Sequence, residues 1–311
     1  MKTNMQIIKL ASLALTVSLL ASCAQNAGSN DNASGLRAQN IVGGTDASAD
    51  YQKANGIVGL VIISEDGPGI CTGTLIHKRL VLTAAHCIAM TRSPIQRIVV
   101  VFAPSLEGAK KENLRYANTG EEHKEFMSSV ISGKGSWNDI ALLKLSEDAP
   151  ADFKVAKLAT ALNDKNLKAD AQAVQAGFGR AEADRDATTD TSGTLRKVEN
   201  IALIKKSDDG KELHFKEDGK GSCNGDSGGP AFLKIGRNLV QVGINSRGTS
   251  RTTCLEVGIF TNILPHLPWI KETAKKLLEA DNMVKADQPA APAPSAPALP
   301  APSAPAPPAA S

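Results

Sequence analysis

The sequence lacks a dominant charge. It contains 35 Lys and Arg against 32 Asp and Glu in 311 residues, which leaves a formal net charge of +3. A chain this balanced offers no strongly basic surface, so we expect neither nucleic acid nor an anionic membrane surface as a partner. Long hydrophobic runs are also missing. Beyond the N-terminal stretch, none reaches the ~18 residues of a transmembrane helix, and we expect no membrane span after processing.

Metal-binding patterns and long helical patterns are absent as well. No residues have the spacing of a zinc site or a calcium loop, so we expect no metal site. Hydrophobic residues make up 42% of the chain, which is enough for a core, and they fall in short runs separated by Gly, Pro, Asn and Asp. These runs predict an all-β fold, either a sandwich or a barrel. Their ranges are 57–63, 80–83, 97–102, 140–145 and 239–244.

Residues 1–22 have the features of a secretory signal peptide. Lys2 and Lys9 give a positive start, and the apolar stretch LASLALTVSLL follows. The stretch continues into Leu-Ala-Ser-Cys, ending at Cys23, and resembles the bacterial lipobox, in which the cysteine is lipidated. The alternative is an ordinary signal peptide with a cysteine there by chance. The lipobox implies an exported lipoprotein at the outer membrane or periplasmic face, or an extracellular protein after release.

The two ends flank one folded domain, which we place at residues 41–285. Residues 23–40 are small and polar, and they predict a flexible linker or propeptide. Residues 286–311 are almost entirely Pro and Ala and predict a disordered tail. A terminal amphipathic helix packed on the domain is predicted from apolar residues at helical spacing, namely Leu267, Ile270, Ala274, Leu277 and Leu278.

The stretch CNGDSGGPAF, residues 223–232, presents Ser227 as a candidate nucleophile. Glycines around a serine are common in turns, and Gly225–Gly229 also matches the nucleophile elbow of α/β-hydrolases. That fold places its histidine after the serine. His266 is the single histidine beyond Ser227, and it lies too near the end of the chain. An esterase on that fold is therefore the less favoured alternative.

Two other residues could activate this serine, since a nucleophilic hydroxyl needs a base and the base needs an orienting acid. His86 follows a β-type run and two small alanines in LVLTAAHC. Asp139 heads the apolar run of SWNDIALLKL, where a carboxylate must be hydrogen-bonded or paired. Taken singly, each residue also fits an ordinary core, capping or surface role.

Taken together, four segments occur in a telling order: IVGG, GTLIHKRLVLTAAHC, NDIALLKL and GDSGGP. The set resembles the chymotrypsin-like (trypsin-fold) serine endopeptidases, and the resemblance covers residues 41–275. It implies two antiparallel six-stranded β-barrels followed by the C-terminal helix. It also implies a monomer that acts on proteins or peptides. A catalytically silent binding module on the same fold is the main alternative.

The resemblance assigns a role to each candidate. Ser227 would attack the scissile carbonyl, His86 would act as general base and then acid, and Asp139 would hold the imidazole in place. The backbone N–H groups of Gly225 and Ser227 would form the oxyanion hole. Hydrolysis would proceed through an acyl-enzyme and would need no cofactor.

Cysteine usage fits this resemblance. Five cysteines are present, and if Cys23 carries lipid, the remaining four can pair in three ways. Export makes disulfides possible. The family pairing implies one bridge between Cys71 and Cys87 and another between Cys223 and Cys254.

The resemblance also locates the pocket for the side chain before the cleaved bond. Gly221 would lie at its base, where an aspartate would select Lys or Arg, so we expect an uncharged pocket that favours large apolar side chains. The sequence departs from the family at Arg247, where Trp is usual. The other residues assigned to substrate binding are Ser222, Ser246, Gly248 and Gly258.

The segment that begins at Ile41 implies activation by cleavage. In the family, the new α-amino group pairs with the acid before the nucleophile, here Asp226. The residue before the cut is Asn40, so we expect an activating protease without trypsin-like preference. Because residues 24–40 contain no cysteine, this cleavage would also release the domain from a lipid on Cys23.

Overall fold

The computed structural model describes residues 41–91, 93–133, 135–184 and 188–286. The predicted signal peptide, the linker with Cys23 and the Pro/Ala-rich tail from residue 287 onward lie outside the described residues. Within the described part of the chain, no helix combines the length and the apolar character needed to cross a bilayer.

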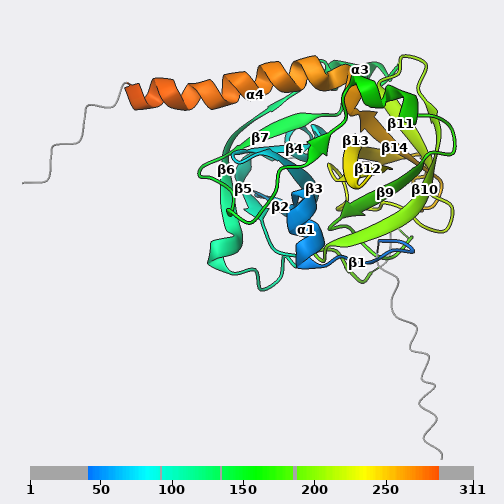
Figure 1. Cartoon of the computed structure of the whole chain (residues 1–311). Coiled ribbons are helices and arrows are strands. Elements are labelled where there is room, and N and C mark those ends of the chain that lie inside the picture. Colours follow the sequence, from blue (N-terminus) through cyan, green and yellow to red (C-terminus); the bar gives the residue numbers. More distant parts are fainter. Residues whose placement is uncertain (1–40, 92, 134, 185–187, 287–311) are drawn as a thin grey trace, which may run out of the picture. The chain divides into compact units, whose positions relative to one another are not determined.

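The first half of the domain forms a closed antiparallel barrel (Figure 1). Its six strands follow the order β2 (Ile57–Ser64), β3 (Gly67–His77), β4 (Leu80–Thr83), β7 (Ala141–Leu145), β6 (Leu114–Glu122) and β5 (Ile95–Val101). Pairing of β5 with β2 closes the ring. Four of the apolar runs noted in the sequence supply β2, β4, β5 and β7, which confirms them as strands.

The second half forms another closed barrel. Its strands follow the order β9 (Gln172–Gly177), β10 (Arg196–Lys206), β11 (Glu212–Lys216), β14 (Val257–Asn262), β13 (Asn238–Gly248) and β12 (Pro230–Ile235). Pairing of β12 with β9 closes this ring. Two short strands lie outside it: β1 (Thr45–Asp46) pairs with β10, and β8 (Lys157–Leu158) pairs with β13. The expectation of two six-stranded barrels is therefore confirmed.

Alternation along the strands fills each barrel with apolar side chains, because successive residues of a strand point to opposite faces. The core of the first barrel includes Val58, Leu60, Leu82, Val100 and Leu142, all with no exposed surface. The core of the second includes Ile201, Leu213, Phe215, Val242 and Phe260. Each barrel thus has a core of its own, and the segments between them are free to carry polar groups.

The C-terminal helix α4 (Ile263–Ala286) confirms the amphipathic pattern seen in the sequence. Ile263, Ile270 and Leu277 are buried in the apolar cluster of the first barrel, and Leu267, Ala274 and Leu278 pack against it. Figure 1 shows α4 in orange, running past β7. The remaining helices are short: α1 (Ala49–Asn55), α2 (His86–Ala89), α3 (Phe126–Ser132), and the 3-10 turns η1 (Lys111–Asn113) and η2 (Ala161–Asn166).

Candidate active site

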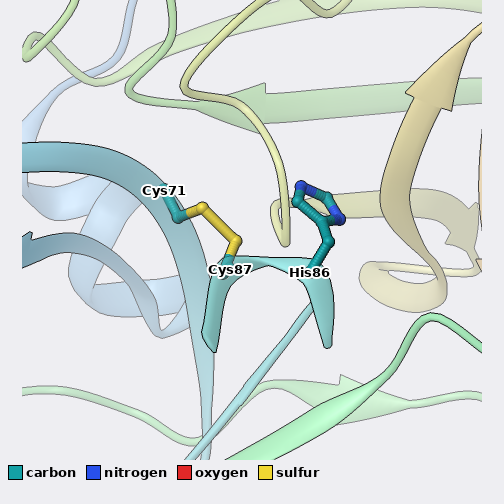
Figure 2. Close-up of side chains that lie close together, drawn as sticks. All are labelled: Cys71, His86 and Cys87. Carbon is teal, nitrogen blue, oxygen red and sulfur yellow. A yellow bond between two sulfur atoms is a disulfide. The ribbon is translucent and has the colours of Figure 1, made fainter. Parts of the chain in front are cut away.

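His86 lies where the first barrel turns from strand to helix. Strand β4 ends at Thr83, two fully buried alanines follow, and His86 begins α2. The next residue, Cys87, is joined by a disulfide to Cys71 on β3. Figure 2 shows this disulfide on one side of the turn and the imidazole of His86 on the other. The bridge therefore ties the histidine segment to the neighbouring strand.

The same three side chains do not form a metal site. A nitrogen of His86 and the sulfur atoms of Cys71 and Cys87 lie within 4.8 Å of one another. The two sulfurs are bonded to each other, so neither is available as the thiolate that a metal requires. That the protein has no metal site stays a prediction.

Asp139 is placed by an unusual backbone turn just before β7. The preceding residue, Asn138, has φ of 49°, in the left-handed region that Asn tolerates better than most residues. Its side-chain oxygen lies 3.2 Å from Nε2 of His266, and Nδ1 of His266 lies 2.7 Å from the Asn262 carbonyl oxygen. The Oγ1 of Thr261 donates to the Asp139 carbonyl at 2.8 Å. Buried polar groups from α4 and β14 thus set the direction of the Asp139 side chain.

The carboxylate of Asp139 has no exposed surface and accepts hydrogen bonds on both oxygens. The His86 backbone N–H donates to Oδ1 at 2.9 Å, and His86 Nδ1 lies 2.7 Å from Oδ2. The Ser246 hydroxyl donates to Oδ2 at 2.6 Å. An ionised carboxylate can only accept, so Nδ1 carries a proton and Nε2 of the neutral imidazole is left as the basic nitrogen.

Asp139 and His86 each stabilise the charged form of the other. Burial alone would raise the pKa of Asp139, but the charge of His86 and the hydrogen bonds from His86 and Ser246 outweigh it and hold the pKa below its ordinary value. Burial alone would lower the pKa of His86, but the adjacent Asp139 raises it above its ordinary value. The arrangement therefore stabilises an imidazolium beside a fully buried carboxylate.

Ser227 lies in a glycine-rich turn that leaves two backbone donors free. Gly225 has φ of 97°, a conformation that suits glycine. Within the described residues, the N–H groups of Gly225 and Ser227 have no acceptor, whereas those of Asp226, Gly228 and Gly229 donate to backbone carbonyls. Two unpaired donors on either side of Asp226 suit a developing negative charge on a bound carbonyl.

Thr72 of β3 holds this turn from the first barrel, a contact that sequence reasoning missed. Its Oγ1 donates to the Gly225 carbonyl at 3.0 Å and accepts from the Phe178 N–H at 3.0 Å. Its backbone N–H donates to the Ser227 carbonyl at 2.8 Å. One buried threonine therefore fixes the nucleophile turn of the second barrel relative to the histidine segment of the first.

His86 and Ser227 line two adjoining cavities together. One, of about 430 Å³, is also lined by Ser222, Ser246 and Gly248, three residues predicted to bind substrate. The other, of about 510 Å³, lies toward the Cys71–Cys87 bridge and residues 67–70. A peptide bound across His86 and Ser227 would have space in the cavities on both sides of these residues.

Asp226 is buried beside Ile41. The two residues line a small internal cavity, where Ile41 is 1% exposed and Asp226 is 2% exposed. The carboxylate accepts from the N–H groups of Gly179 and Cys223, each at 2.8 Å. Burial nevertheless raises its pKa to about 7, although Arg196 nearby opposes this. Burial of this acid leaves its charge poorly compensated in the uncleaved chain.

A second buried acid, Glu217, lies beside two of the residues predicted to bind substrate. It is 2% exposed and lies between Gly221 and Gly258, so a Cβ added at Gly221 would be 2.5 Å from its Cβ and one at Gly258 would meet its carboxylate. Ser222 donates to Oε1 from its hydroxyl at 2.8 Å and from its N–H at 3.2 Å. The expectation of an uncharged pocket was drawn from glycines such as Gly221, and it stays a prediction; the structure adds a buried carboxyl group from the residue that follows β11.

Arg247, the departure from the family pattern, lines the 430 Å³ cavity but is neutralised by a neighbour. Its Nη1 and Nη2 lie 2.8 and 3.1 Å from the two carboxylate oxygens of Glu212. Its guanidinium lies 4.1 Å from the ring centre of Trp137, in a cation–π contact. The backbone N–H of Trp137 also donates to the Glu212 carboxylate at 3.1 Å. Arg247 is thus part of the wall rather than a free cation.

The second disulfide joins Cys223 to Cys254. With the Cys71–Cys87 bridge, it confirms the pairing implied by the family resemblance. It connects the segment before the nucleophile to the loop between β13 and β14. Disulfides of this kind persist in oxidising compartments, which fits an exported protein.

Comparison with known proteins agrees with this geometry. The sequence profile of the family described as Trypsin matches residues 41–270. A CLIP domain-containing serine protease C9 from Anopheles gambiae is 25% identical over 232 residues, which are 67% of this chain and 61% of that protein. The chain thus spans less than two thirds of the length of this curated relative.

The fold also resembles a solved structure described as HL collagenase. The TM-score is 0.61 at 21% identity, and the match covers 76% of this chain and 99% of the other. At this identity the likeness concerns the fold, which is the pair of β-barrels.

Proposed function

Because the chain belongs to the trypsin family, we propose that it is a serine endopeptidase with His86, Asp139 and Ser227 as its catalytic triad. The observation that carries this proposal is the contact between His86 Nδ1 and the fully buried carboxylate of Asp139, 2.7 Å apart, with His86 and Ser227 on the walls of the same two cavities. The substrate would be a protein or peptide that lies across both cavities. No cofactor takes part in this chemistry.

The proposed reaction has two halves. Nε2 of His86 takes the proton of the Ser227 hydroxyl as Oγ forms a bond to the peptide carbonyl carbon, and the oxyanion accepts from the Gly225 and Ser227 N–H groups. The intermediate expels the amine, which receives the proton from His86, and an acyl-enzyme remains. Water then attacks the ester by the same route, with Ser227 as the leaving group. Asp139 holds the proton on Nδ1 throughout.

A fluorophosphonate probe tests this proposal, because it reacts with an activated serine whatever the substrate preference. We expect the processed protein to be labelled on Ser227, mapped by peptide mass, and to cleave peptide bonds. Ser227→Ala should abolish both, whereas the exposed Ser128→Ala should change neither. A correctly processed protein that takes no label would instead support the catalytically silent binding module.

We also propose that cleavage before Ile41 activates the protein. Ile41 already lines the cavity that contains Asp226, so a free α-ammonium at that position would reach a carboxylate that burial leaves poorly compensated. The Val42 carbonyl accepts from the Gly221 N–H at 2.9 Å, which connects the new N-terminus to the pocket base. An activating protease is then a required partner.

The lipobox extends this proposal to the membrane. With Cys23 lipidated, cutting after Asn40 would activate the domain and release it in one event. Cell fractionation with N-terminal sequencing tests the idea: the soluble active species should begin at Ile41. Full activity in a lipidated species that still carries residues 23–40 would overturn it.

A further inference from the structure

We infer that Glu217 supplies a negative charge at the base of the substrate pocket and selects a basic side chain before the cleaved bond. The inference rests on the proposed endopeptidase function. It reverses the preference expected from Gly221 alone, and it depends on a residue ten positions before the nucleophile.

The first support is position. Glu217 follows the last residue of β11 (Glu212–Lys216), and its backbone N–H donates to the Glu256 carbonyl at 2.9 Å. The Glu217 side chain lies between Gly221 and Gly258. Both positions are glycine, so the carboxyl occupies the volume that their side chains would otherwise fill.

The second support is access from the cavity. Ser222 lines the 430 Å³ cavity together with His86 and Ser227, and both its hydroxyl and its N–H donate to Glu217. The carboxyl therefore lies one hydrogen bond behind the cavity wall. Glu217 does not itself line the cavity; its carboxyl group lies behind Ser222 and leaves the cavity open.

The third support is that the Glu217 carboxyl has no cationic partner among the described residues: no Lys, Arg or His there forms an ion pair with it. Burial raises the pKa of its carboxyl to about 7 against the opposing hydrogen bonds from Ser222, and the nearby Asp226 raises it further. A buried acid without a cation is costly, and a substrate cation would remove that cost.

Two arginines on the same cavity do not cancel this charge. Arg247 is paired with both carboxylate oxygens of Glu212 and stacks on Trp137. Arg251 is exposed, where solvent and salt screen its charge. Glu217, in contrast, is enclosed, so its interaction with a substrate cation is screened far less.

The test compares peptide substrates that differ only in the residue before the cut: Arg, Lys, Phe or Ala. With the Ile41 form, we expect the highest kcat/KM for Arg or Lys. Glu217→Gln should lower kcat/KM for the basic substrates at least ~30-fold and leave the Phe substrate within ~3-fold. Glu256→Gln is the matched control, because the Glu256 carbonyl accepts from the Glu217 N–H while its side chain is exposed; this substitution should change neither value. Glu217→Asp should restore part of the basic preference.

Fluorophosphonate titration separates the two possible failures. An unlabelled wild-type protein would refute the proposed endopeptidase. A labelled protein whose ratio of Arg to Phe cleavage is unchanged by Glu217→Gln would refute the role of Glu217 alone.

A measurement on the wild-type protein covers the case in which Glu217→Gln fails to fold. Benzamidine should inhibit peptide cleavage at concentrations at least ~30-fold lower than its neutral isostere benzamide. Equal inhibition by the two compounds would overturn the inference.

Discussion

Asp139 accepts hydrogen bonds on both oxygens of its carboxylate and is the proposed orienting acid of the triad. Its Oδ2 lies close to both His86 Nδ1 and the Ser246 hydroxyl, while its Oδ1 accepts the His86 backbone N–H. Asp139→Asn would place an amide donor against Nδ1 and favour the tautomer whose proton is on Nε2. We expect kcat to fall about 10⁴-fold with the fold intact.

Steady-state kinetics and circular dichroism check this expectation. Asp148→Asn, an exposed acid paired with Lys78, is the control and should keep full activity. A loss smaller than tenfold in Asp139→Asn would argue against its orienting role.

The pH dependence follows from the raised pKa of His86. Only the neutral imidazole can take the Ser227 proton, so kcat/KM should fall as pH drops through the pKa of His86 in the free enzyme. Because Asp139 raises that pKa, the acid limb should lie above the ordinary value of 6.5. A pH profile of kcat/KM measures it. A limb well below 6.5 would contradict the charge pairing described above.

Asn138 offers a test of backbone strain at the same scale. Its φ of 49° disfavours alanine, which lacks both the short polar side chain and the freedom of glycine. Both Asn138→Ala and Asn138→Gly lose the contact with His266, so their difference isolates the backbone term. We expect Asn138→Ala to be less stable than Asn138→Gly by roughly 1 kcal/mol. Urea unfolding in a Ser227→Ala background measures this, and equal stabilities would show that the turn relaxes.

At the scale of elements, β3 carries one of the contacts between the two barrels. Thr72→Val keeps the shape of the side chain but removes the hydroxyl that joins Gly225 to Phe178. A buried carbonyl and a buried N–H then lose their partner, at a cost of about 1–3 kcal/mol. Since Gly225 provides a proposed oxyanion donor, we expect kcat to fall more than KM rises.

Thr72→Ser is the matched control for this change, because it keeps the hydroxyl. Its kcat should stay near that of the wild-type protein, with a small loss of stability from the missing methyl group. If Thr72→Val were equally active, the nucleophile turn would not depend on β3.

At the scale of the whole molecule, activation should change the response of stability to pH. In the uncleaved chain, the pKa of Asp226 is raised from 3.8 to about 7. Its contribution to stability is therefore complete below pH ~4 and is lost as pH rises through about 7. In the proposed activation, the Ile41 ammonium would pair with this carboxylate and relieve that loss. Pairing raises the ammonium pKa above its usual value of about 8, so this gain should persist until pH passes the raised value.

The comparison uses the uncleaved chain and the Ile41 form, both with Ser227→Ala to prevent self-digestion. At pH 8 we expect the Ile41 form to be more stable by on the order of 2–4 kcal/mol, and the difference to shrink toward pH 4. Differential scanning calorimetry across this range measures it. With Asp226→Asn, the two forms should have nearly equal melting temperatures. A stability difference between the two forms that does not change with pH would show that the Ile41 ammonium does not pair with Asp226.

Patterns among neighbouring residues predicted many of the strands, the C-terminal helix and the candidate catalytic residues. Short apolar runs between turn residues predicted four strands of the first barrel and one of the second, because buried strands are rich in apolar residues and end at turn residues. The spacing from Leu267 to Leu278 predicted α4. Ser227, His86 and Asp139 stood out because each lies in a contiguous segment whose order along the chain distinguishes one fold from another.

The position of Glu217, in contrast, was decided by tertiary structure. Gly221 and its neighbours suggested an open, neutral base, but the end of β11 lies against β14 and brings Glu217 between Gly221 and Gly258. The roles of Thr72 and Asn138 were equally invisible, because their partners are more than a hundred residues away. The short motifs around His86, Asp139 and Ser227 indicated which side chains could react. Which charges surround those groups depends on strand pairing and burial, and these arise only when distant segments meet.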